Sequence, residues 1–177
     1  MALAPLRFVR ALQRLAVHRW QETRVRSALP DAALDRLSAR VAASEKRHTG
    51  QIRICAEGAL PWSYLSRDAS TRERALMLFS KLRVWDTEHN NGVLIYLLVP
   101  EHAIEVVADR ALARKVPPGE WNALVAQMAV HFRDGNYEDG LAQAVEAVSV
   151  RLEQHFPRDA TTDGDSGNEL PDAPVIR

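Results

Sequence analysis

The chain has 177 residues, in which 23 Lys and Arg balance 23 Asp and Glu. A single cysteine, Cys55, excludes an internal disulfide. The longest apolar run, residues 93–100, is far shorter than the roughly 20 residues that span a membrane, which excludes an ordinary transmembrane helix.

Residues 5–26 predict a basic amphipathic helix within an N-terminal segment, residues 1–29. Apolar side chains such as Leu6, Val9 and Leu12 recur at helical spacing, and most arginines lie off that face. Arginines also interrupt the apolar residues, unlike in a signal peptide, so we expect a cytoplasmic protein. Two hypotheses follow for this helix: it packs on a protein partner, including a second copy in a homo-oligomer, or it lies peripherally on an anionic membrane surface.

Residues 30–156 predict a single domain that begins with a helix and a strand. Pro30 and Asp31 suit a first helical turn, and that helix ends before Gly50. Residues 52–57 alternate in polarity and predict a strand. Cys55 on this strand is expected to be a packed thiol, and the face that carries Glu57 is expected to be partly solvated.

The middle of the domain predicts a mixed sheet. Residues 93–99 are apolar throughout, as in a central strand covered on both faces. A short link to the strand at 103–108 permits only an antiparallel hairpin, whereas a helix after the Ser70–Glu73 capping box makes the strands at 52–57 and 93–99 parallel. Three helical segments follow, at residues 111–115, 120–132 and 137–152.

Residues 157–177 predict a disordered acidic tail. They contain five acidic residues and very few apolar ones. Such a composition buries too little apolar surface to offset the conformational entropy lost on folding.

Two motifs in this order resemble the TPM domain family. Phe79, Trp85 and residues 91–95 are similar to its Phe…Trp…Asn-Gly-Val-Leu signature, and residues 132–141 are similar to its closing Phe-Arg-x-Gly-Asn-Tyr motif. The resemblance covers roughly residues 30–156. It implies an α/β fold, a three-layer α/β/α sandwich around a small mixed sheet. Without a signal peptide or a membrane span, the chain resembles the cytoplasmic bacterial branch of the family.

The resemblance also bears on activity. It implies an acid phosphatase by analogy with a plant member, and divalent metal binding by analogy with a bacterial one. The family's glycine-rich turn after the third strand is replaced here by residues 108–111.

The loop before the central strand is the candidate site. Carboxylate and amide oxygens in a turn are typical ligands of Ca²⁺ or Mg²⁺. The hairpin predicts that an aspartate at the end of the third strand lies beside this loop. The candidate metal ligands are Asp86, Glu88, Asn90, Asn91 and Asp109. The alternative is a structural loop, in which Asn91-Gly92 supplies positive φ and Asp86 caps a turn.

Two functions are therefore open. One is a non-catalytic binding or assembly module, which we favour, and the other is a metal-assisted phosphatase. His89 and His102 are the candidates for proton transfer in the second case. We expect no organic cofactor, because the phosphate-binding and zinc motifs are missing. We expect no nucleic-acid partner either, because beyond the N-terminal arginines there is no basic face with interleaved aromatic residues.

Overall fold

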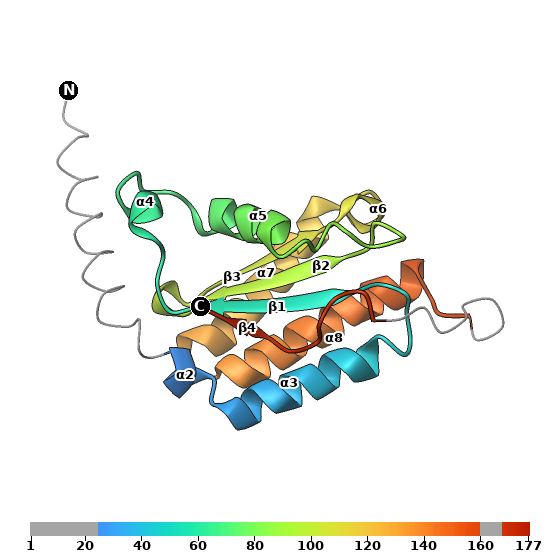
Figure 1. The fold of residues 1–177 in the computed structure, drawn as a ribbon, viewed down its shortest axis with the longest axis horizontal. Coiled ribbons are helices and arrows are strands. Elements are labelled where there is room, and N and C mark those ends of the chain that lie inside the picture. The colour runs from blue at the N-terminus through green and yellow to red at the C-terminus, as the bar shows by residue number, and fades with distance from the viewer. Residues whose placement is uncertain (1–24, 160–167) are drawn as a thin grey trace.

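The computed structural model describes residues 25–159 and 168–177 (Figure 1). The predicted helix at residues 5–26 therefore lies almost wholly outside the described residues. The elements in chain order are α2 (Val25–Ala28), α3 (Asp31–Ser44), β1 (Ile52–Glu57), α4 (Trp62–Leu65), α5 (Thr71–Lys81), β2 (Val93–Leu98), the 3-10 turn η1 (Val99–Glu101), β3 (Ala103–Ala108), α6 (Arg110–Ala113), α7 (Pro118–Arg133), α8 (Tyr137–His155) and β4 (Val175–Ile176).

These elements form three layers, which confirms the predicted α/β/α sandwich. The sheet has the order β3-β2-β1-β4. Helices α3, α7 and α8 cover one face, and α5 covers the other (Figure 1). Two apolar clusters fill the spaces between the layers, since alternate residues of each strand point to opposite faces.

Strand β2 is the centre of the sheet. It runs parallel to β1, with Ile54 opposite Ile95, and antiparallel to β3, with Ile95 opposite Val106. All its residues are buried. The continuous apolar run thus correctly predicted its central place, and the short link to β3 correctly predicted the hairpin.

Two local features fix how helices α5 and α8 are placed, and the first of them, the cap of α5, was predicted. The Ser70 side chain accepts a hydrogen bond from the Glu73 amide at 3.1 Å, which caps the start of α5. A Cβ atom on Gly140 would lie 2.6 Å from the ring of Phe132, so a side chain there would force the buried Phe132 ring to move.

The C-terminal segment differs from the predicted disordered tail. The described residues 168–177 lie along β1, and β4 adds a parallel strand there. Leu170 is buried, and the Gln51 side chain accepts hydrogen bonds from the amides of Glu169 and Leu170. The prediction was wrong for these residues because an open sheet edge orders a segment too short to order itself.

The face of β1 that carries Cys55 and Glu57 is also less exposed to solvent than predicted. Glu57 is 1% exposed and accepts hydrogen bonds from Arg74 at 2.5 and 2.8 Å and from the Tyr96 hydroxyl at 2.8 Å. The expected solvated face is therefore wrong at this position, because α5 and the C-terminal segment cover it. Cys55 on the same face is buried, and burial raises the pKa of its thiol to about 12, so the expected packed thiol is confirmed.

Candidate functional site

The loop before β2 lies at the amino ends of the parallel strands β1 and β2. In Figure 1 it lies at the right-hand end of the sheet, beside α6. The hairpin brings the end of β3 to the same end of the sheet, where the Asp109 backbone amide donates to the Gly92 carbonyl at 2.8 Å. We call this place, formed by the loop before β2 and the end of β3, the corner. The predicted neighbourhood of the loop and Asp109 is therefore present in the fold.

The loop owes its shape to two adjacent positions. Asn90 has a φ of 51°, a left-handed conformation that asparagine tolerates better than most residues. Gly92 has no such φ, but a Cβ atom there would lie 2.0 Å from the Val84 carbonyl oxygen. The predicted positive φ of the Asn91-Gly92 pair is therefore wrong, because the turn and its positive φ end at Asn90, and Gly92 is needed instead for close backbone approach.

Asp109 is a buried carboxylate with one oxygen unused. Its side chain is 5% exposed and caps α6, where Oδ1 accepts a hydrogen bond from the Arg110 amide at 2.6 Å. The Arg110 Nε lies 3.8 Å from the same oxygen. Within the described ranges, Oδ2 has no hydrogen-bond partner.

Asn91 repeats this pattern in the loop. Asn91 is fully buried. Its backbone amide donates to the Thr87 hydroxyl at 3.2 Å, and its side-chain Nδ2 donates to the Thr49 hydroxyl at 3.3 Å. Its Oδ1 accepts no hydrogen bond from any described residue. Because Asp109 pairs with Gly92, the next residue, the corner holds two buried oxygens without partners.

Asn90 joins the loop to α6. Its carbonyl accepts a hydrogen bond from the Ala111 amide at 3.0 Å, and its Oδ1 accepts one from the Arg110 guanidinium at 2.9 Å. Its side-chain oxygen therefore already has a donor, unlike those of Asn91 and Asp109. For Asn90 Oδ1 to become a metal ligand, its hydrogen bond from Arg110 would have to break.

The other two predicted ligands face water. Asp86 is exposed and pairs with Arg83 at 2.5 Å, and Glu88 is exposed as well. In residues 25–159 and 168–177, no three His, Cys, Asp or Glu side chains form a group that could hold a metal ion. The carboxylates of Asp86, Glu88 and Asp109 therefore do not converge.

Among the described residues, neither candidate histidine forms a hydrogen bond with the buried oxygens of this corner. His89 is exposed in the loop. His102 lies in the β2–β3 turn, where its Nδ1 is 2.6 Å from the Phe132 carbonyl oxygen and 3.0 Å from the Tyr137 hydroxyl. These contacts give His102 a structural place between the hairpin and the α7–α8 connection.

Sequence reasoning missed several residues of the corner. Thr87 and Thr49 orient Asn91, and Arg110 bridges Asn90 and Asp109. Glu169 comes from the C-terminal segment, where its side chain accepts a hydrogen bond from the Glu88 amide at 2.8 Å. Thr87 and Arg110 are local, since they lie within a few residues of Asn91 and Asp109. Thr49 and Glu169 are brought in from distant parts of the chain.

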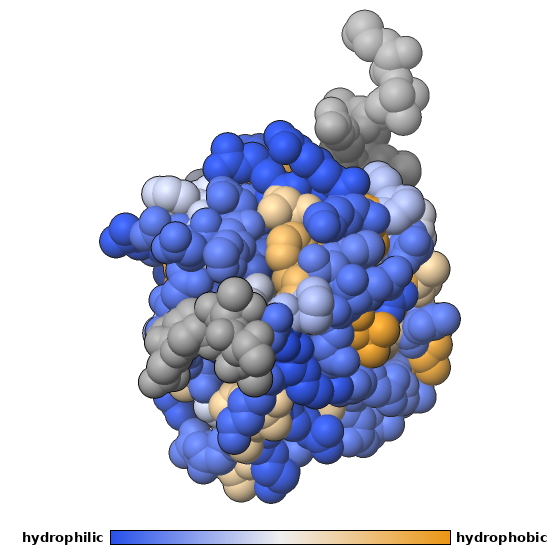
Figure 2. All heavy atoms as spheres, turned by 90° about the vertical axis from the view of Figure 1, so that its right-hand side faces the viewer, coloured by the Kyte–Doolittle hydropathy of each residue, from blue (hydrophilic) through white to orange (hydrophobic). Residues whose placement is uncertain are grey.

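Figure 2 shows the end of the molecule that carries this loop. The surface there is mainly hydrophilic, and apolar residues form a few separate patches. A small polar or charged ligand suits such a face better than a broad apolar partner does.

Comparison with known proteins identifies the family. The family model of the TPM domain matches residues 25–151. The chain belongs to the TPM domain family. The match includes the whole three-layer core of the TPM domain, from α2 to most of α8, and leaves the segment with β4 outside it.

Solved structures share the TPM fold. The NMR structure of the BA42 protein from the psychrophilic bacterium Bizionia argentinensis has a TM-score of 0.71 at 23% identity, covering 84% of this chain and 95% of that one. The N-terminal domain of a P. gingivalis protein has a TM-score of 0.61 at 22% identity, covering 81% and 92%. No curated protein matches the chain. In the described part of the TPM chain, no helix is long and apolar enough to cross a membrane.

Proposed function

We propose that this TPM domain is a non-catalytic binding module that takes a divalent cation, Mg²⁺ or Ca²⁺, at the corner of Asn90, Asn91 and Asp109. The observation that supports it is the pair of buried oxygens without partners, Asn91 Oδ1 and Asp109 Oδ2. Leaving such atoms unpaired costs free energy. Carboxylate and amide oxygens are the ligands that these hard cations prefer, so binding would offset that cost.

The charges at the corner set the expected affinity. Asp109 supplies one buried negative charge, and the Arg110 guanidinium beside it opposes a cation. Asp86 and Glu88 are exposed in the same loop, where they attract a cation without ligating it. So small a ligand charge predicts weak binding, with a Kd on the order of 10⁻³ M.

NMR titration tests this proposal. Mg²⁺ or Ca²⁺ added to the ¹⁵N-labelled full chain is expected to shift the amide signals of residues 90–92 and 109–111. Asp109→Asn is expected to abolish these shifts, because it removes the charge and keeps an oxygen that can cap α6. Asp86→Asn is the matched control and should leave the shifts in place. Equal shifts in Asp109→Asn, or shifts confined to other regions, would overturn the cation site.

A metal-assisted phosphatase is the alternative that the family resemblance implies. A phosphatase should hydrolyse p-nitrophenyl phosphate with Mg²⁺ present and lose turnover in a folded Asp86→Ala variant. A binding module should show no metal-dependent hydrolysis. Turnover that is lost when the metal is removed would therefore overturn the non-catalytic proposal.

The cellular place of the module is part of the same proposal. We place it in the cytoplasm, in contact with a protein partner, a second copy or a membrane surface through residues 5–26, a segment almost wholly outside the described residues. Sedimentation of the full chain with anionic vesicles tests the membrane contact. Replacing the arginines of residues 5–26 by glutamine should release the chain from the vesicles, and unchanged sedimentation would remove that contact.

A further inference from the structure

The outer side of β3 is an open edge of the sheet. In the described part of the chain, β4 covers the other edge, whereas no strand lies beyond β3. The Asp109 amide points toward β2, and antiparallel pairing alternates inward and outward groups along a strand. The backbone groups of Ile104, Val106 and Ala108 therefore point away from β2. The Val106 carbonyl shows this directly, since it accepts a hydrogen bond from the Arg72 side chain at 2.5 Å.

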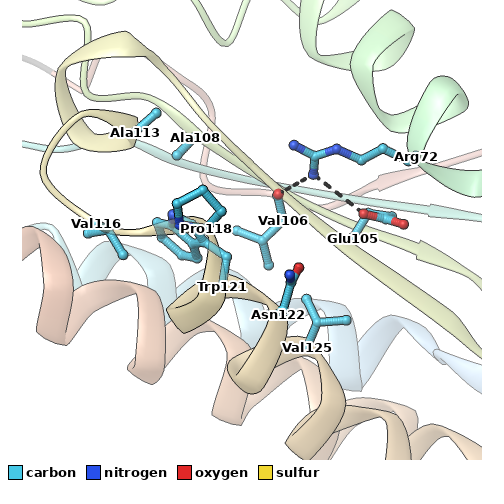
Figure 3. Close-up of a pocket in the computed structure, with 10 residues that line it drawn as sticks. All are labelled: Arg72, Glu105, Val106, Ala108, Ala113, Val116, Pro118, Trp121, Asn122 and Val125. Carbon is cyan, nitrogen blue, oxygen red and sulfur yellow. Dashed lines mark hydrogen bonds and ion pairs between the residues drawn. The ribbon is translucent and has the colours of Figure 1, made fainter.

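A cavity of about 490 Å³ adjoins this edge. Figure 3 shows that its two walls differ. On the α7 side lie apolar side chains, among them Val116, Trp121 and Val125. On the α5 side Arg72 reaches across to Glu105 and Val106 (Figure 3). The edge of β3 thus runs between an apolar wall and the exposed ion pair of Arg72 with Glu105.

We propose that this groove binds an extended peptide that adds a strand to β3 and carries an apolar residue next to an Asp or Glu. Outward amides and carbonyls at every second residue fit an extended backbone, and the peptide would replace Arg72 at the Val106 carbonyl. Successive side chains of an added strand point to opposite faces. One side chain then contacts the apolar wall at Trp121, and its neighbour faces Arg72. The long 3.4 Å contact of Arg72 with Glu105 leaves the guanidinium able to take a second carboxylate.

The opposite edge of the same sheet shows how such a strand is held. Arg177 donates its amide to the Ala56 carbonyl at 3.0 Å, and its carbonyl accepts from the Gly58 amide at 2.9 Å. Its guanidinium lies 3.4 Å from the Glu57 carboxylate. Backbone pairing plus one charged contact therefore already attaches an extended segment to this sheet. The β3 edge offers the same two elements with the sign of the charge reversed.

The site is separate from the proposed cation corner and does not depend on it. A blocked octapeptide, KTTLETTK, is a suitable probe, because threonine favours a strand and the central Leu-Glu carries the predicted pattern. Added to the ¹⁵N-labelled full chain at millimolar concentration, it is expected to shift the amides of Ile104, Val106 and Ala108 and the indole of Trp121. A peptide with proline in place of the leucine cannot extend the backbone pairing and should not bind.

Two variants test the two walls. Trp121→Ala should weaken peptide binding about ten-fold, as truncation of a central aromatic contact does. Arg72→Glu should lose KTTLETTK and bind KTTLKTTK instead, and Glu suits the first turn of α5, so the variant should fold. Arg83→Ala, an exposed arginine elsewhere, is the control. No shift along β3, shifts that map to β1, or equal binding of both peptides by Arg72→Glu would overturn the proposal.

Discussion

Two buried carboxylates at opposite ends of the sheet differ in how their charge is met. Glu57 has hydrogen-bond or ion-pair partners on both oxygens, from Arg74, Tyr96 and Arg177. One oxygen of Asp109 accepts a hydrogen bond from the Arg110 amide, and the other has no partner among the described residues. Solvent exposure does not distinguish the two residues, because both are buried. The partners of each oxygen make Glu57 a structural residue and Asp109 a candidate ligand.

The Glu57 network also shows what full pairing does to its members. Burial works against the charge of Arg74, but the hydrogen bonds and charge of Glu57 outweigh it and raise the pKa of Arg74. Burial, together with the adjacent Glu57 charge, raises the pKa of the Tyr96 hydroxyl. The network thus keeps Arg74 charged and Tyr96 protonated, which suits a permanent ion pair and not a proton-transfer site.

The largest effect is expected from Glu57→Gln. It leaves the Arg74 guanidinium buried without its counter-charge, which should lower the free energy of unfolding by about 3 kcal/mol. Urea denaturation measures this loss. Glu73→Gln breaks the exposed pair with Arg67 and should cost far less, because solvent screens that pair. Equal losses in the two variants would contradict the structural importance of the buried pair.

A pH effect of intermediate size is expected from a third buried carboxylate, Glu45. Its Oε1 accepts a hydrogen bond from the Ile52 amide at 2.7 Å, and burial raises its pKa to about 8. The folded chain therefore keeps this proton up to about pH 8, whereas the unfolded chain loses it near the ordinary value of 4.5. Because the folded state binds more protons between these values, the free energy of unfolding falls as pH rises.

Denaturation at about pH 6.5 and about pH 8 tests this titration. The wild type should lose about 1 kcal/mol between them, and Glu45→Gln should lose much less. His48 does not obscure the comparison, because burial lowers its pKa to about 4 and its contribution is confined below about pH 6.5. A parallel decline in Glu45→Gln would assign the pH effect to other groups.

The smallest effect is expected from Asp109→Asn without added metal. One carboxylate oxygen of Asp109 has no partner to lose, and asparagine keeps the cap of α6, so the free energy of unfolding should change by less than about 0.5 kcal/mol. Urea denaturation with and without Mg²⁺ measures it. A loss near that of Glu57→Gln would show that the two carboxylates are alike after all.

Much of the core could be predicted because its signals are local. The apolar run of β2 requires cover on both faces, the short link to β3 requires a hairpin, and Ser70 with Glu73 starts α5 within a few residues. The site was predicted in part. The hairpin brings Asp109 to the loop, but Asp86 turns to Arg83 and stays in water.

Long-range contacts explain what could not be predicted. The segment with Glu169 and β4 has no apolar period of its own and is ordered only by the open edge of β1. The partners of Glu57 and the oxygens left alone at Asn91 and Asp109 depend on residues far apart in the chain. The sequence by itself determined the strands β1, β2 and β3, the hairpin and the family, because these follow from short-range patterns. Only the tertiary structure decided which buried charges are paired, because partners meet across layers that no local pattern records.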